Sequence, residues 1–416
     1  MCASASLLTM AGSADIREAS VWAKLDNPSE GVSAKFFAAK NPEKKFEAKI
    51  VQLGDKYNPE IVKIVLENLS PATEYVYEVS NGGQKSTGQI KTQADYKTRT
   101  PPPDFTFVAL GANHINDKIF DEAFREPGGE YEIFEAVKNT KPAFALWVGA
   151  LNNYRNADTG SRSAITSRLA ELRALAQARP LLNSQPNYGV FGANVLSDAS
   201  SKSAANHSKV FDIFWCNPEN AVGNARAYSF SYADADFFVL DDFSNSSNLD
   251  YKSARPKMLG DEQLEWLFTA IQNSKATFKF IVMNTPVFNP VENGKNFTHA
   301  EQERKRLLNF LSDKKIEGII AISGKKDYGE VTRFIRAGSY PVTEVTAGPL
   351  TARAAKEVSE MNYFRVPSSS TLCRSFVQIK IEGAEGSRAA TITFFNSKGE
   401  AGFSTTIRES DLKKFD

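Results

Sequence analysis

The sequence predicts an α/β protein that carries a small all-β domain at its N-terminal end. Short segments that alternate apolar and polar residues fill positions 19–92, and three consecutive prolines follow at 101–103. Strand-like and helix-like segments then alternate as far as residue 324. The length of 416 residues is too great for one modest core and leaves room for two domains.

The first domain is expected over residues 15–95. Its segments have a period of two and are separated by Asn-Pro, Gly and Asn-Gly-Gly turn signals, which is typical of an antiparallel sandwich. The stretch LSPATEYVY at 69–77 resembles the corner of fibronectin type III-like modules, in which a tyrosine hydroxyl caps a turn. The segments are VWAKL (21–25), VSAKFFA (32–38), KFEAKIVQL (45–53), EIVKIVLENL (60–69), EYVYEVS (74–80) and STGQIKT (86–92).

Residues 1–14 are expected to form an N-terminal tail. The stretch MCASASLLTMAGSA contains a short apolar run but lacks the basic start of a complete export signal. Three interpretations stay open: a truncated signal, a lipid-bearing Cys2, or a plain disordered terminus. The first two predict an extracytoplasmic location, whether periplasmic, secreted or lipid-anchored.

A linker is expected at 96–104, because consecutive prolines cannot donate to a strand ladder and favour an extended spacer. The second domain then occupies 105–416. Its C-terminal strands are expected to complete a second sheet. The expected elements are strands at 105–112, 144–150 and 318–324, helices at 119–124, 131–140 and about 161–178, and the C-terminal strands at 374–383, 389–397 and 401–407.

Charge and composition exclude several classes of protein. Fifty basic residues face forty-nine acidic residues, so no net field attracts nucleic acid, and no nucleic-acid partner is expected. No run of 18 apolar residues predicts a transmembrane segment. The three cysteines have no CxxC spacing.

Several segments of the second domain resemble the PhoD-like alkaline phosphatase and phosphodiesterase family of metallophosphoesterases. The resemblance implies a four-layer α/β/β/α sandwich that holds two metal ions at the carboxyl ends of its strands. Those metals would be Fe, Ca, Zn or Mn. The resembling segments are 225–244, 258–290, 303–324, 339–352 and 362–370.

The resemblance also implies that several positions that hold metal ligands in the family carry other residues in this chain. Ala112 replaces a cysteine after the first strand, and Ala150 replaces the bridging aspartate after the second. Lys325 stands where an acidic residue is expected, where its ammonium would oppose a divalent ion. The positions of this degenerate pocket are Ala112, Asn113, Ala150, Asn194, Asp241, Asp242, Lys325 and Asp327.

Several alternatives stay open at this pocket. Lys325 could replace the charge of a metal and neutralise Asp327 or Asp241. A single weak metal could be held by Asn113 with His114, Asn194 and Asp327. Asp241 and its neighbour Asp242 follow a buried strand, and we expect them to accept hydrogen bonds from loop amides.

The sequence therefore predicts a catalytically degenerate homologue of this family, with no cofactor and no confident catalytic residue. Such a protein would bind an unknown protein partner or a phosphate-bearing ligand. The alternative is an active phosphatase or phosphodiesterase with an atypical metal site. A third interpretation is an envelope or assembly component whose β-sandwich supplies the contact surface.

Overall fold

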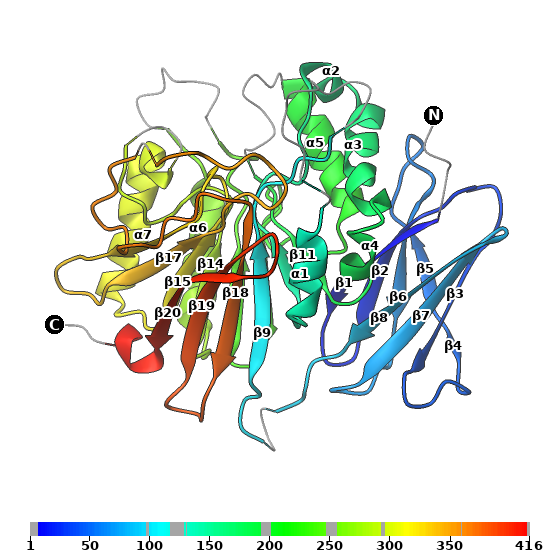
Figure 1. Ribbon diagram of the computed structural model, residues 1–416, viewed down its shortest axis with the longest axis horizontal. Coiled ribbons are helices and arrows are strands. Elements are labelled where there is room, and N and C mark those ends of the chain that lie inside the picture. The colour runs from blue at the N-terminus through cyan, green and yellow to red at the C-terminus, as the bar shows by residue number, and fades with distance from the viewer. Residues whose placement is uncertain are drawn as a thin grey trace.

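The computed structural model describes residues 7–96, 100–116, 129, 131–192, 201–246, 256–292, 296–358 and 360–413. An all-β domain lies beside a larger α/β domain, and the two are in contact along one side (Figure 1). The α/β prediction is confirmed.

The first domain consists of two four-stranded antiparallel sheets, in the orders β1-β2-β6-β5 and β4-β3-β7-β8. Apolar side chains on alternate positions of the strands form the core between them. The backbone N–H of Ser70 donates to the hydroxyl of Tyr75 at 2.8 Å, which is the contact expected of a tyrosine corner. The strands are β1 (Leu8–Ala14), β2 (Ala19–Lys24), β3 (Val32–Ala38), β4 (Phe46–Glu47), β5 (Lys49–Gln52), β6 (Ile61–Leu66), β7 (Glu74–Asn81) and β8 (Gln84–Lys91).

The expected N-terminal tail is wrong for residues 8–14, which form strand β1. This strand pairs with β2, and the side chains of Met10 and Ala11 are buried. The short apolar run therefore belongs to the core of the domain. Cys2 lies outside the described residues. Within the described ranges, no helix has the length and apolar character needed to cross a membrane.

The second domain contains two six-stranded sheets, in the orders β11-β10-β9-β18-β19-β20 and β12-β13-β14-β15-β17-β16. In the first sheet β11, β10 and β9 run parallel, and β18–β20 continue the sheet antiparallel. In the second, the central strands β13, β14, β15 and β17 run parallel, and β12 and β16 are antiparallel at the edges. The C-terminal strands extend the sheet of β9, the domain's first strand, because β18 pairs with β9 directly. The strands are β9 (Phe105–Leu110), β10 (Ala145–Trp147), β11 (Asn187–Gly189), β12 (Tyr228–Tyr232), β13 (Ala235–Val239), β14 (Phe278–Val282), β15 (Ile319–Ser323), β16 (Glu330–Phe334), β17 (Val342–Thr346), β18 (Ser375–Glu382), β19 (Ala389–Asn396) and β20 (Ala401–Arg408).

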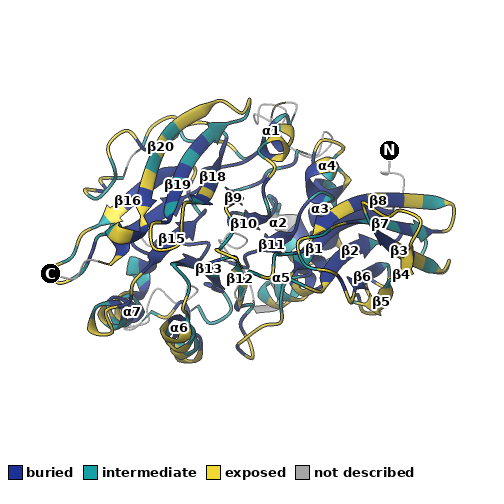
Figure 2. Ribbon diagram, turned by 90° about the horizontal axis from the view of Figure 1, so that it is seen from below, coloured by how far each residue is buried: buried dark blue, intermediate teal, exposed yellow. Residues whose placement is uncertain are grey.

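Helices α6 and α7 lie on one side of the domain, and the other helices lie near β9, β10 and β11, whereas no helix of the described residues lies over the outer face of β19 and β20 (Figure 2). The helix expected over 161–178 ends at Ala174, since Leu175 has an extended backbone. The helix expected at 119–124 falls outside the described residues. The helices are α1 (Ile133–Asn139), α2 (Asn156–Thr159), α3 (Arg162–Ala174), α4 (Arg179–Leu182), α5 (Ser201–Phe214), α6 (Asp261–Asn273) and α7 (Glu301–Asp313), with 3-10 turns η2 (Phe297–Ala300) and η3 (Glu409–Leu412).

The two faces of β9 contribute to two different cores. Phe107 faces the second sheet, where its ring lies 5.1 Å from that of Phe237 and 5.3 Å from that of Phe280. Val108 and Leu110 face the helices. This alternation explains why the strand is apolar on both faces.

The helical layer also packs against the first domain. Trp22 of β2 is fully buried, and its indole N–H donates to the carbonyl of Ile213 at 2.8 Å. The guanidinium of Arg173, from α3, lies 3.9 Å from the centroid of the Trp22 ring, a cation–π contact. One apolar cluster therefore includes side chains of both domains.

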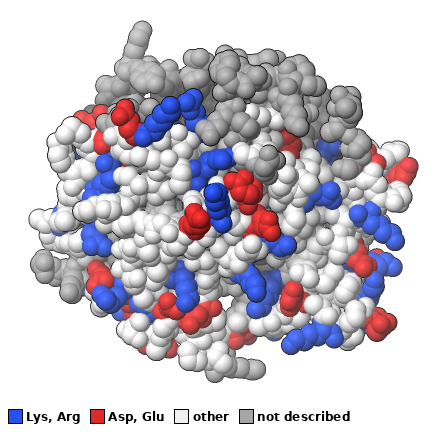
Figure 3. All heavy atoms as spheres, viewed as in Figure 1, with Lys and Arg blue, Asp and Glu red and all other residues white. Residues whose placement is uncertain are grey.

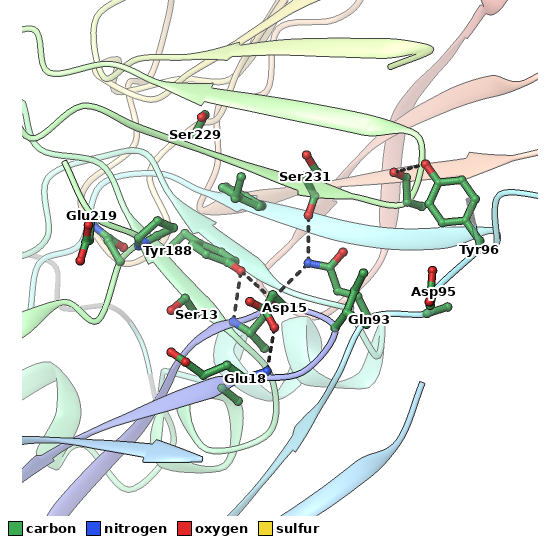
Figure 4. A pocket seen from close by; sticks show the side chains of 18 of the residues that line it. Ser13, Asp15, Glu18, Gln93, Asp95, Tyr96, Tyr188, Glu219, Ser229 and Ser231 are labelled. Atoms are coloured by element: carbon green, nitrogen blue, oxygen red, sulfur yellow. Dashed lines mark hydrogen bonds between the residues drawn. The ribbon is translucent and has the colours of Figure 1, made fainter. Parts of the chain in front are cut away.

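A cleft of about 460 Å³ lies along this domain junction. The amide of Gln93 points across it and donates to the carbonyls of Ala14 at 3.1 Å and Ser231 at 2.9 Å (Figure 4). Ser231 precedes β13, so the cleft lies at the opposite edge of the sheet from the carboxyl ends of the parallel strands. We assign it to the domain junction.

A buried arginine fixes the end of the linker. Arg388 has no exposed surface and lies just before β19. Its guanidinium donates to both carboxylate oxygens of Asp234 at 3.1 and 3.0 Å, and to Asp104 at 2.7 Å. It also donates to the carbonyls of Pro103 and Gly383. The linker is therefore tied to two turns of the α/β domain.

Candidate functional site

The carboxyl ends of the parallel strands of both sheets meet at one edge of the domain, in direct backbone contact. A Cβ on Gly149, after β10, would lie 2.1 Å from the backbone nitrogen of Ala112, after β9. A Cβ on Gly324, after β15, would lie 2.4 Å from the carbonyl oxygen of Val148. No side chain fits at either glycine, because it would overlap with backbone atoms. We call this region the strand-end edge.

Ala112 and Ala150 do come together at the strand-end edge, as the resemblance implies, but they supply only methyl groups. Between them, Asn113 donates its backbone N–H to the carbonyl of Ala150 at 2.8 Å. The carbonyl of Ala112 accepts from the backbone N–H groups of Leu350 at 2.9 Å and Thr351 at 3.2 Å. The side chain of Asn113 is 2% exposed, and its amide oxygen accepts from the Thr351 hydroxyl at 3.4 Å.

Asp241 and Asp242, after β13, hold loops through hydrogen bonds. Both are fully buried. Asp241 accepts from the backbone N–H of Arg226 at 2.7 Å, and from the N–H and hydroxyl of Ser244 at 2.8 and 2.6 Å. Burial raises the pKa of Asp241, and these hydrogen bonds oppose that rise. Asp242 accepts from the backbone N–H of Thr285 at 2.7 Å.

A small cavity of about 20 Å³ lies behind the strand-end edge. A space of roughly 10–15 Å³ holds one water molecule, so this cavity has room for little more. Its wall is mainly apolar, with three polar side chains. The lining residues are Gly149, Ala150, Leu151, Tyr154, Ile165, Leu169, Val190, Phe191, Gly192, His207, Phe211 and Asn284.

His207 lines this cavity, and the sequence did not lead us to expect a buried histidine here. It is 4% exposed, and its Nε2 has no hydrogen-bond partner among the described residues. Its ring meets that of Tyr154 edge-on, with centroids 4.9 Å apart. Burial lowers the pKa of His207 to about 4. Helical spacing was the available signal, because His207 shares one face of α5 with Val210, Phe211 and Phe214.

Because His207 is buried in its neutral form, we expect the free energy of unfolding to fall in acid. The unfolded chain takes up a proton at the ordinary pKa of about 6.5, whereas the folded chain does so only near pH 4. The stability that depends on neutral His207 is therefore present above pH 6.5 and is lost as the pH falls toward 4, by at most about 3 kcal/mol. Urea unfolding at a series of pH values measures it.

The substitution His207→Leu should flatten this part of the pH profile, since no proton can then bind in the unfolded state. His299→Gln, at a histidine in the turn before α7, is the matched control and should keep the wild-type slope. An unchanged slope in His207→Leu would show that other groups carry the pH dependence.

The two lysines after β15 have different roles. Lys326 is buried, and its ammonium contacts the carboxylates of Glu330, at 3.2 Å, and Glu360. Burial alone would lower the pKa of Lys326, but these carboxylates raise it. Lys325 is half-buried, and its ammonium forms no ion pair within the described part of the chain. It therefore neutralises neither Asp241 nor the exposed Asp327, contrary to one alternative above.

The hypothesis of a single weak metal gains no support from these positions. The side chain of Asn113 is engaged by Thr351, and that of Asp327 is exposed. His114 is half-buried, and its backbone N–H donates to the Thr351 hydroxyl. Asn194 lies outside the described residues. Among the residues that the structure does describe, no three His, Cys, Asp or Glu side chains form a group that could hold a metal.

The residues present at the strand-end edge do not fit the two metal ions that the resemblance implies. Such ions lie about 3.5–4 Å apart and need bridging and flanking donors and an open position for water. Here the backbone of Gly149 packs on that of Ala112, and the space behind them has room for about one water molecule. The carboxylate of Asp241 already accepts from backbone and hydroxyl donors.

Residues 218–387 match the model of a family described as PhoD-like phosphatase. The matched segment extends from the residues before β12 to the turn before β19. It contains Asp241, Asp242, Lys325 and Asp327, whereas Ala112 and Ala150 lie outside it. No curated protein matches the chain.

Comparison with solved structures shows the fold. A structure described as PhoD aligns with a TM-score of 0.75, covering 98% of this chain and 90% of that chain at 15% identity. The sensor domain of the anti-sigma factor RsgI4 of Pseudobacteroides cellulosolvens covers 23% of this chain and 99% of its own, at 17% identity and a TM-score of 0.19. A single mutant of Vps29 from Entamoeba histolytica covers 73% and 99%, at 8% identity and a TM-score of 0.29. The last two scores are too low to carry an argument.

Proposed function

We propose that this chain, a relative of the PhoD-like phosphatases in sequence over residues 218–387 and in fold over nearly its whole length, binds a ligand or partner without hydrolysing phosphoesters. One observation carries the proposal. At the strand-end edge the backbone of Gly149 contacts that of Ala112 within one sheet, and the backbone of Gly324 contacts that of Val148 between the two sheets.

The chemistry of phosphoester hydrolysis explains why that observation supports the proposal. Two metal ions activate a water molecule and stabilise the charge that develops on the phosphoryl group. The two metal ions require an open pocket whose carboxylate side chains point toward them. In this chain alanines occupy two of the ligand positions, and Lys325 adds a positive charge at a third. We infer that the scaffold has been kept while the hydrolytic centre has been lost.

The proposal predicts no phosphatase or phosphodiesterase activity above background. The purified chain would be incubated separately with Fe, Zn, Ca and Mn, and then assayed with p-nitrophenyl phosphate and bis-p-nitrophenyl phosphate over a range of pH. Elemental analysis of the protein as isolated should find much less than two metal ions per chain. An active metallophosphoesterase assayed in parallel shows that the conditions support hydrolysis.

A substitution separates trace contamination from activity of this chain. Asp327 is exposed and follows β15, where the family carries a metal-binding motif, so Asp327→Asn should leave the fold intact. Contaminating activity would be equal in both preparations. Metal-dependent turnover that Asp327→Asn removes would show that the chain is an enzyme and would overturn the proposal.

We also infer that the N-terminal domain is a fibronectin type III-like sandwich. The paired four-stranded sheets and the hydrogen bond of Tyr75 to Ser70 support this inference. An extracytoplasmic location stays a prediction.

A further inference from the structure

A surface pocket of about 400 Å³ lies next to the strand-end edge. Three segments form it: residues 352–356, residues 372–374 at the start of β18, and the turn 396–400 between β19 and β20. Its volume falls in the range of roughly 300–1,000 Å³ that is usual for pockets that bind small molecules. We call it the basic pocket, because four of the side chains that line it are basic.

The backbone of the basic pocket is fixed by hydrogen bonds. The N–H of Ala352 donates to the carbonyl of Ala112 at 3.2 Å, and that of Ala355 donates to the carbonyl of Asp327 at 2.7 Å. The first segment therefore crosses the strand-end edge. In the turn, the amide oxygen of Asn396 accepts from the backbone N–H groups of Lys398 at 2.9 Å and Glu400 at 3.0 Å.

The charges of the lining are strongly unbalanced. Four basic side chains, Arg353, Lys356, Arg374 and Lys398, face one carboxylate, that of Glu400. The amide nitrogen of Asn396 donates to this carboxylate at 2.7 Å, which reduces its ability to attract the cations. The neighbouring acidic residues Asp327 and Glu357 do not line the pocket. Over the face of the molecule seen in Figure 3, basic and acidic side chains are interspersed.

Three of these cations have no side-chain partner among the residues that the structure describes. Within the described ranges, the side chains of Arg353, Lys356 and Lys398 make no hydrogen bond, ion pair or ring contact. Like charges held around one pocket repel each other, and a multivalent anion between them relieves that repulsion. Guanidinium and ammonium groups together are the usual donors to phosphate oxygens.

We propose that the basic pocket binds a small soluble ligand that carries two or more phosphate groups. Several cations distributed over three segments match an extended polyanion better than a single phosphate ion. This deepens the proposed function and rests on it, because the ligand is held beside the strand-end edge and is not hydrolysed. The two proposals are tested by different measurements, binding here and turnover above.

Cys373 provides a direct readout of occupancy. It is an exposed thiol in the lining of the basic pocket, whereas Cys216 is buried. In a Cys2→Ser background, a thiol-reactive dye should therefore label Cys373. Tripolyphosphate or pyrophosphate should slow this labelling, and isothermal titration should show saturable binding with one site per chain. Binding should weaken as salt is added, because the contacts are ionic.

A triple variant tests the pocket, and a distant lysine supplies the control. Arg353→Gln, Lys356→Gln and Lys398→Gln together remove three exposed charges and should raise the dissociation constant of tripolyphosphate by about tenfold or more. Lys40→Gln removes an exposed charge of the first domain and should leave it unchanged. Circular dichroism verifies that each variant is folded.

The outcomes decide between sources of the phosphate and between the two proposals. Saturable binding lost in the triple variant supports the pocket. Equal binding by wild type and triple variant, or no protection of Cys373, overturns it. Binding only to vesicles of phosphatidylglycerol, and not to soluble tripolyphosphate, overturns the soluble ligand in favour of a lipid headgroup. Release of inorganic phosphate from bound tripolyphosphate would instead contradict the absence of hydrolysis and leave the binding site standing.

Discussion

Replacement of Arg388 by methionine is expected to lower the free energy of unfolding of the α/β domain by about 3–5 kcal/mol. The substitution keeps an extended side chain but leaves the carboxylate of Asp234, which is 8% exposed, without its bidentate partner. It also removes a donor from the carbonyls of Pro103 and Gly383. Guanidinium chloride unfolding, followed by circular dichroism, measures the change.

Two further variants separate the buried pair from the exposed one. Asp104 is the exposed partner of Arg388, with 61% of its side chain exposed. Asp104→Asn should therefore lower the free energy of unfolding by at most about 1 kcal/mol. Combining Arg388→Met with Asp234→Asn removes both buried charges and should recover part of the loss. If Arg388→Met unfolds within 1 kcal/mol of the wild type, the buried network does not stabilise the domain.

Gly149→Ala is expected to destabilise the chain by about 3 kcal/mol, and it tests the close backbone contact at the strand-end edge directly. The new methyl group would lie 2.1 Å from the backbone nitrogen of Ala112, so the ends of β9 and β10 must separate. The backbone of Gly149 does not have a positive φ, so the cost comes from overlap and not from strain. Chemical unfolding of the purified variant measures it.

Gly160→Ala is the matched control for this substitution. Gly160 caps α2 with a right-handed helical backbone, and no other atom would lie within 4 Å of the added methyl group. Because alanine reduces the entropy of the unfolded chain, this variant should be unchanged or more stable by about 0.4–1 kcal/mol. If Gly149→Ala behaved in the same way, the ends of β9 and β10 could not be in close contact.

Local sequence patterns were sufficient to predict most of the fold. Period-two segments predicted the β-domain, and the apolar runs at 105–112 and 318–324 correspond to β9 and β15. Two elements were exceptions. Residues 8–14 were expected to form a tail, but they pair with β2, the next strand in the chain. The position of β18 depends on a contact that no local pattern encodes, because this strand pairs with the distant β9.

The candidate site was harder to predict than the fold. The resemblance predicted that Ala112 and Ala150 lie near each other, and the structure brings these residues together. The full role of Lys326 was not visible, because one of its two carboxylate partners, Glu360, lies 34 residues away in the chain. His207 was assigned no role from the sequence, and the packing of α5 places it in a cavity. Each miss concerns a contact between residues that are distant in sequence.

The contact between Trp22 and the helical layer means that the β-domain is not an exchangeable module. Side chains of Leu8 and Met10 belong to the same apolar cluster as those of α1, α3 and α5. A fragment that began after the linker would present this surface to solvent and would tend to self-associate. Fusion or domain-swapping designs that treat the prolines as a point of division would therefore cut through a shared hydrophobic interface.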